Sequence, residues 1–84
     1  MNNRHRKTLA AVYAVPTPQR IPLADIEALL VAAGAKLVEG RGSRVRFVSG
    51  KMVATFHRPH PEKEARPYQV RAAREFLEQI GVRL

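Results

Sequence analysis

The fold is decided by residues 43–57, which read SRVRFVSGKMVATFH. In the first half, Val45 and Phe47 alternate with arginines, and a period of two is typical of a strand with one buried face. Gly50 lies between the halves, where a tight turn needs a residue that adopts positive φ. The second half continues the alternation, with Met52, Ala54 and Phe56 expected inside and Val53, Thr55 and His57 outside. The stretch therefore predicts an antiparallel hairpin.

Amphipathic helices are expected on both sides of this hairpin. Residues 23–33 carry apolar side chains at spacings of three and four, which gives one buried stripe, and Gly34 is a suitable stop. A short strand over residues 35–39 and a turn over residues 40–42 connect this helix to the hairpin. A last helix begins near residues 67–69, and its buried stripe consists of Val70, Ala73, Phe76, Leu77 and Ile80. These elements predict an α-β-β-β-α order with a three-stranded antiparallel sheet.

The N-terminal part is expected to differ from this body. Residues 2–7 are polar and predict a mobile basic arm, residues 8–15 predict a short extra helix, and residues 16–22 form a proline-rich lead-in. We therefore divide the chain into residues 1–22 and a main domain of residues 23–84. The fold class is α+β, and two helices on one sheet face leave the other face open for function.

The net positive charge of the chain indicates which class of molecule it binds. The 84 residues include 15 Lys plus Arg and 7 Asp plus Glu, a net charge of +8, and eleven of the cations are arginine. Arginine offers a planar fork of donors that suits phosphate. No apolar run approaches the roughly 18 to 20 residues that span a bilayer, so no membrane association is expected. The absence of cysteine excludes disulfides and Cys-based zinc sites, and the polar N-terminus does not resemble a signal peptide, so a cytoplasmic location is expected.

The hairpin brings candidate site residues together. Because the turn lies at residues 49–51, residues whose numbers sum to about 100 face each other, and the outward alternation then pairs Arg44 with His57. With Arg46, these residues would form a cationic patch that has one titratable member. His60 follows three residues later in a proline-rich loop. Two histidines beside an arginine fit metal-free phosphodiester chemistry as base and acid better than a metal site, and no cofactor is expected.

Several short motifs, taken in their order along the chain, resemble those of the HicA family of type II toxin–antitoxin ribonucleases. They include a Leu-Leu pair before Gly34, the Gly-Ser pair that opens the second strand, and the closing glycine. The remaining motifs lie between the sheet and the last helix, and the full set is Leu29, Leu30, Gly34, Gly42, Ser43, His60, Pro61, Lys63, Glu64, Pro67, Arg71 and Gly81. The resemblance covers about residues 23–82.

The resemblance implies a double-stranded-RNA-binding-domain-like fold, metal-independent cleavage of mRNA, and neutralisation by a HicB-like antitoxin. Family members usually place a catalytic histidine directly after the Gly-Ser pair, where this chain has Arg44. A guanidinium stays charged and cannot act as a general base at neutral pH. Three interpretations follow: His57 transfers the proton, His60 does so from the loop, or the protein binds without cutting. We hypothesise the first.

The expected site therefore has two sets of residues. The catalytic candidates are His57 and His60, and the RNA-binding candidates are Arg41, Ser43, Arg44, Arg46, Arg58 and Lys63. Two other functions share the same basic patch. A non-catalytic RNA-binding module would bind with strong salt dependence and form no product. A protein-interaction domain would dock an acidic partner and ignore RNA.

Overall fold

The expected hairpin is present in the computed structural model, which describes residues 1–58 and 63–84. Strand β2 (Arg44–Ser49) pairs antiparallel with β3 (Met52–His57), and Gly50 takes a φ of 58° in the turn. Strand β1 (Lys36–Glu39) pairs antiparallel with the other side of β2, so the sheet order is β1-β2-β3. The three-stranded antiparallel sheet predicted from the sequence is confirmed.

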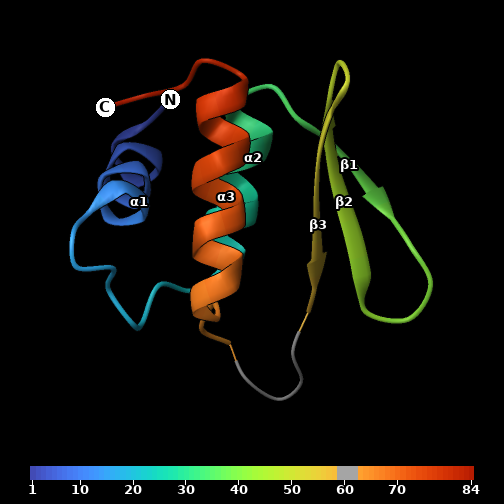
Figure 1. The fold of residues 1–84 in the computed structure, drawn as a ribbon, viewed down its shortest axis with the longest axis horizontal. Coiled ribbons are helices and arrows are strands. Elements are labelled where there is room, and N and C mark those ends of the chain that lie inside the picture. The colour runs from blue at the N-terminus through green and yellow to red at the C-terminus, as the bar shows by residue number, and fades with distance from the viewer. Residues whose placement is uncertain (59–62) are drawn as a thin grey trace.

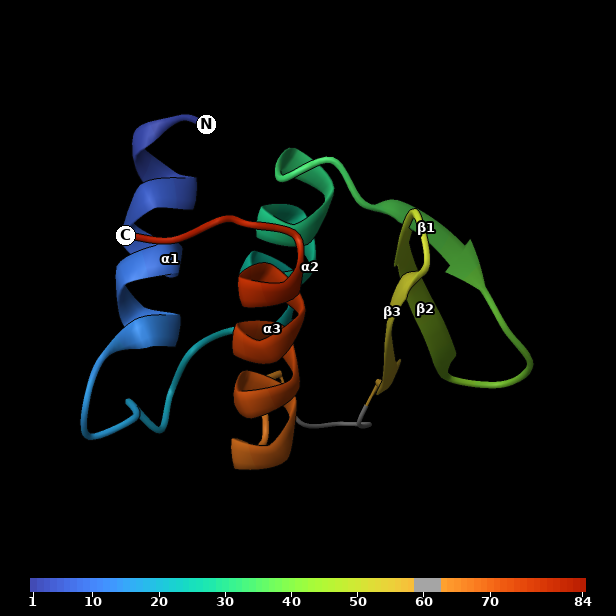
Figure 2. The same ribbon diagram turned by 45° about the horizontal axis from the view of Figure 1, so that its top comes forward.

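The helices form two layers on one side of this sheet. Helices α2 (Leu23–Ala32) and α3 (Pro67–Gln79) cover the sheet, and α1 (Asn3–Tyr13) packs on their far side (Figures 1 and 2). The element order is α-α-β-β-β-α. The α+β class and the double-stranded-RNA-binding-domain-like arrangement are confirmed. Among the described residues, no helix has the length and apolar character needed to cross a membrane.

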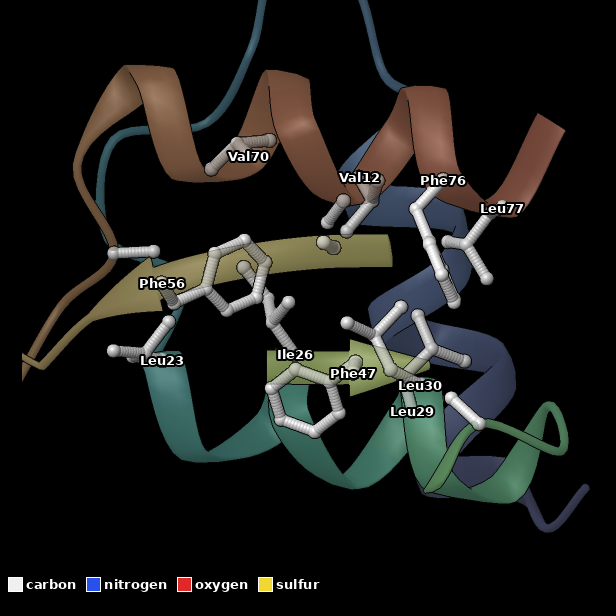
Figure 3. Packing of buried hydrophobic residues seen from close by; sticks show 14 of the residues in the cluster. Val12, Leu23, Ile26, Leu29, Leu30, Phe47, Phe56, Val70, Phe76 and Leu77 are labelled. Carbon is white, nitrogen blue, oxygen red and sulfur yellow. The ribbon is translucent and has the colours of Figure 1, made fainter. Parts of the chain in front are cut away.

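One apolar core joins the layers. Phe47 from β2 and Phe56 from β3 lie between the sheet and the helices, with ring centroids 5.6 Å apart (Figure 3). Ile26 of α2 and Phe76 of α3 belong to the same core cluster and are fully buried. The expected inward alternation of β3 holds at Ala54 and Phe56. Met52 lies on the same side by register, but it is 37 % exposed because it belongs to the last pair before the turn.

The first helix is longer than the sequence predicted. Residues 3–7 were expected to form a mobile arm, but the helix already begins at Asn3. The side chain of Asn2 accepts a hydrogen bond of 2.9 Å from the N–H of His5 and so caps the helix start. Arg4 also forms an ion pair with Asp25 of α2. A cap and a tertiary contact therefore extend a helix whose first turn has no apolar pattern.

No described element covers the sheet face opposite the helices (Figures 1 and 2). We call this surface the open face. Its residues follow from the strand register, because side chains at paired positions point to the same side. The open face consists of Lys36, Val38, Arg44, Arg46, Val48, Val53, Thr55 and His57.

Candidate nucleic-acid interface

Arg44 and His57 face each other across the hairpin, as the turn position predicted. The N–H of Arg58 donates to the carbonyl of Ser43 at 2.8 Å, one position outside this pair. Arg44 and His57 therefore form a non-hydrogen-bonded pair, the kind in which opposite Cα atoms approach to about 4.5 Å and side chains lie closest. Both residues are exposed. The geometry places a permanent cation beside an imidazole on the open face.

Ser43 holds the ring of His57. Its hydroxyl Oγ lies 2.9 Å from Nε2 of the imidazole, from the loop residue just before β2. When Nε2 carries the proton and donates to Oγ, Nδ1 is the unprotonated ring atom. No described group bonds to Nδ1. The contact thus restrains the ring and leaves Nδ1 facing away from the serine.

From the sequence, Ser43 was expected only to contact RNA. Its contact with His57 is one that sequence reasoning missed. The signal was available in the register, because Ser43 immediately precedes the residue that pairs with His57.

The rest of the open face extends the positive charge. Arg46 lies on β2 opposite Thr55 of β3, and both are exposed. Arg41 is exposed at the turn before β2. Gly40 donates its N–H to the carbonyl of Arg44 at 2.8 Å, and a Cβ at Gly40 would lie 3.3 Å from the Cβ of Arg44. Glycine at this position therefore leaves room for the arginine side chain.

Arg58, one of the RNA-binding candidates, points to the side of the sheet that the helices cover. Its guanidinium bonds to Glu27 of α2 at 2.8 Å and to Glu39 of β1 at 3.3 Å. The hydrogen bond to Glu27 raises the pKa of Arg58 above its ordinary value, against the smaller opposing effect of burial. The charge of Arg58 is therefore matched by two carboxylates, and its role in RNA binding stays a prediction. The side chain joins the sheet to α2 beneath His57.

Gln69 is a second residue that the sequence did not identify. It is fully buried in the first turn of α3, and its Nε2 donates to the backbone carbonyl of His57 at 2.7 Å. Its Oε1 accepts from the N–H of Arg66 at 2.8 Å. A buried amide with both ends bonded is a rigid link, because breaking either bond leaves an unsatisfied polar group. A glutamine within an apolar helical stripe was the available signal.

Two candidates lie apart from this cluster. Lys63 is exposed, and its carbonyl accepts from the N–H of Leu23 at 2.9 Å, which places it beside the start of α2. His60 lies outside the described residues. Within residues 1–58 and 63–84, no three His, Asp or Glu side chains gather as metal ligands would.

Comparison with models of protein families identifies the family of the chain. A family model described as the HicA toxin of bacterial toxin–antitoxin systems matches residues 24–82. The chain belongs to the HicA toxin family. The HicA match covers the sheet together with α2 and α3, and α1 lies outside it. No curated protein and no solved structure matches this HicA chain.

Proposed function

We propose that this HicA family member is a metal-independent endoribonuclease that cleaves mRNA, with His57 as the group that transfers the proton. The observation that carries the proposal is the hydrogen bond between Ser43 and His57 on a face that also presents Arg44 and Arg46. A restrained imidazole beside fixed cations is an arrangement suited to phosphodiester chemistry. Membership in the HicA family supports a role as a toxin, and the residues of the open face support the proposed cleavage chemistry.

The proposed reaction uses the 2′-hydroxyl of RNA as the nucleophile. Nδ1 of His57 takes the proton of the 2′-hydroxyl as its oxygen attacks the adjacent phosphorus. The bond from phosphorus to the 5′ oxygen breaks, and that oxygen takes a proton from solvent. The products are a 2′,3′-cyclic phosphate and a 5′-hydroxyl. Arg44 and Arg46 stabilise the negative charge that grows on the phosphoryl oxygens, since one guanidinium group can donate two parallel hydrogen bonds to a phosphate.

A HicB-like antitoxin is the expected protein partner. An acidic surface that covers the open face would complement its positive charge and would also exclude RNA. The open face bears no described carboxylate that would repel such a partner. The proposed inhibition is therefore competition for the same arginines.

The deciding experiment is RNA cleavage in EDTA by the full chain and by His57→Gln. We expect the wild-type protein to cut in chelator, and His57→Gln to cut roughly 10²- to 10⁴-fold more slowly, the usual contribution of a general acid or base. His5→Gln is the matched control, because His5 lies on α1 and not on the open face. It should cleave at the wild-type rate.

Other results would select the alternatives. Full activity in His57→Gln would remove His57 from the reaction. RNA binding without product from the wild-type protein would favour a non-catalytic RNA-binding module. Neither binding nor cleavage would favour a domain that docks only an acidic protein.

A further inference from the structure

Tyr68 is the most exposed aromatic side chain of the molecule. The chain has three phenylalanines, two tyrosines and no tryptophan. Phe47, Phe56 and Phe76 are fully buried in the core. Tyr13 is partly buried, and its hydroxyl donates to the carbonyl of Val82 at 2.8 Å. Tyr68 is 44 % exposed and lies outside the buried core. Its ring is therefore available to a partner.

Tyr68 lies next to the end of β3 that carries His57. Gln69 Nε2 donates to the carbonyl of His57 at 2.7 Å and lies 3.4 Å from the hydroxyl of Tyr68. The tyrosine hydroxyl and the His57 carbonyl therefore meet at one buried amide. Because Gln69 is fully buried, this junction is fixed in the fold.

The strand geometry gives the direction from His57 to Tyr68. In the pair of Arg44 and His57, the backbone groups of His57 point away from β2, because the neighbouring Arg58 makes the bond to β2. β3 is an edge strand, so these groups point to its free edge. Tyr68 thus lies just beyond the edge, on the side of His57 opposite to Arg44.

We propose that Tyr68 is a stacking platform for one unpaired base of an RNA strand whose backbone lies on the open face. The substrate class is then single-stranded RNA. The base of a duplex is already stacked on both sides and cannot offer its face to the ring, whereas an unpaired base can. Stacking on an aromatic side chain accepts any base, so Tyr68 supplies affinity and position without strict sequence preference. This inference rests on the proposed function of the same face, since it assigns the substrate to that site.

The test measures binding, so that it does not depend on cleavage. The probe is a fluorescent ten-nucleotide RNA with 2′-O-methyl groups, which lacks the nucleophile and cannot be cut. We expect Tyr68→Ala to weaken binding roughly 5- to 150-fold, the range that loss of one base stack produces. Tyr68→Phe keeps the ring and should bind within twofold of the wild-type chain. Gln79→Ala, an exposed truncation at the other end of α3, is the matched control and should have no effect.

Three further measurements examine the stacking itself. In a set of RNAs with one abasic position each, one position should weaken binding to the wild-type chain but not to Tyr68→Ala. With the same sequence as a duplex, Tyr68→Ala should change binding by less than twofold. Tyr68→Trp introduces the only tryptophan of the chain, and its fluorescence should be quenched when single-stranded RNA binds.

The outcomes separate this inference from the proposed function. Equal binding of single-stranded RNA by Tyr68→Ala and the wild-type chain would overturn the stacking role and leave His57 untouched. An equal loss for duplex RNA would also overturn it. Binding that depends on Tyr68 in a protein that cuts no RNA would support the platform and contradict the nuclease. Absence of any RNA binding by the wild-type chain would overturn both.

Discussion

His57 is positioned by contacts from three parts of the chain. The register of the hairpin sets it opposite Arg44, Ser43 holds its ring, and Gln69 holds its backbone carbonyl. The sequence predicted only the first of these contacts, because the position of a turn fixes the register of its strands. The other two depend on side-chain conformations and on how α3 approaches the sheet, which no local pattern specifies.

Gln69→Leu tests whether the buried amide positions His57. The change leaves the His57 carbonyl and the Arg66 N–H without their partner, and each unsatisfied group costs about 1 to 3 kcal/mol. We expect a fall in melting temperature of at least about 8 °C, since about 4 to 8 °C corresponds to 1 kcal/mol in a domain of this size. At a temperature where the variant is folded, single-turnover cleavage should slow by on the order of 10- to 100-fold.

Gln69→Glu is the matched variant for this prediction. It keeps an acceptor for the Arg66 N–H but loses the donor to the His57 carbonyl. It therefore distinguishes the effect of the hydrogen bond at the start of α3 from the effect of the hydrogen bond to β3. Both variants should slow cleavage with little change in KM for RNA, because the side chain at position 69 does not contact Arg44 or Arg46. Unchanged cleavage by folded Gln69→Leu would mean that the amide supports the fold alone.

At the scale of elements, α1 shows where sequence patterns are insufficient. The apolar residues Leu9 and Val12 are buried against the helices, and they predicted a helix over residues 8–15. The observed start at Asn3 depends on the cap by Asn2 and the ion pair of Arg4, which have no periodic signal. At the other end, Nε of Arg74 donates to the carbonyl of Val12 at 2.9 Å, a favourable place for a cation. A local cap and tertiary contacts thus act together at the ends of α1.

Tyr13 makes the docking of α1 dependent on pH. Burial, and then the charge of Glu78, raise the pKa of Tyr13 above the usual 10, and the neutral hydroxyl donates to the Val82 carbonyl. The folded state therefore holds this proton more tightly than the unfolded chain does. The stabilisation is fully present below pH 10 and is lost as the pH rises through the folded-state pKa.

Tyr13→Phe should therefore lower the free energy of unfolding at pH 8 by about 0.5 to 1.5 kcal/mol, the usual contribution of one hydrogen bond. The difference from wild type should shrink as the pH rises above 10, in urea unfolding followed by circular dichroism. Glu78→Gln removes a charge that raises this pKa, so its stability should begin to fall at a lower pH than that of the wild type. A difference between Tyr13→Phe and wild type that stays constant from pH 8 to 11 would contradict this linkage.

At the scale of the whole molecule, the surplus charge is distributed unevenly. The described carboxylates lie away from the open face, on α2, on α3, at Glu64 and at Glu39, which points toward Arg58. Three of them, Asp25, Glu27 and Glu39, neutralise arginines among the helices and beneath the sheet. The net charge of +8 indicated a phosphate partner from the sequence. The fold adds that the open face carries Lys36, Arg44 and Arg46 and no described acid.

This distribution predicts which arginines control the salt dependence of RNA binding. Each phosphate that a cation neutralises on a single strand adds about 0.7 to the slope of log K against log salt concentration. Arg44→Gln and Arg46→Gln should each reduce the slope by about 0.7, and the double variant by about 1.4, for the 2′-O-methyl RNA. Arg83→Gln removes the same charge from the C-terminal segment beside Tyr13 and should leave the slope unchanged. If all three single variants lowered the slope equally, the whole surface would attract RNA through net charge, and the open face would have no special part in binding.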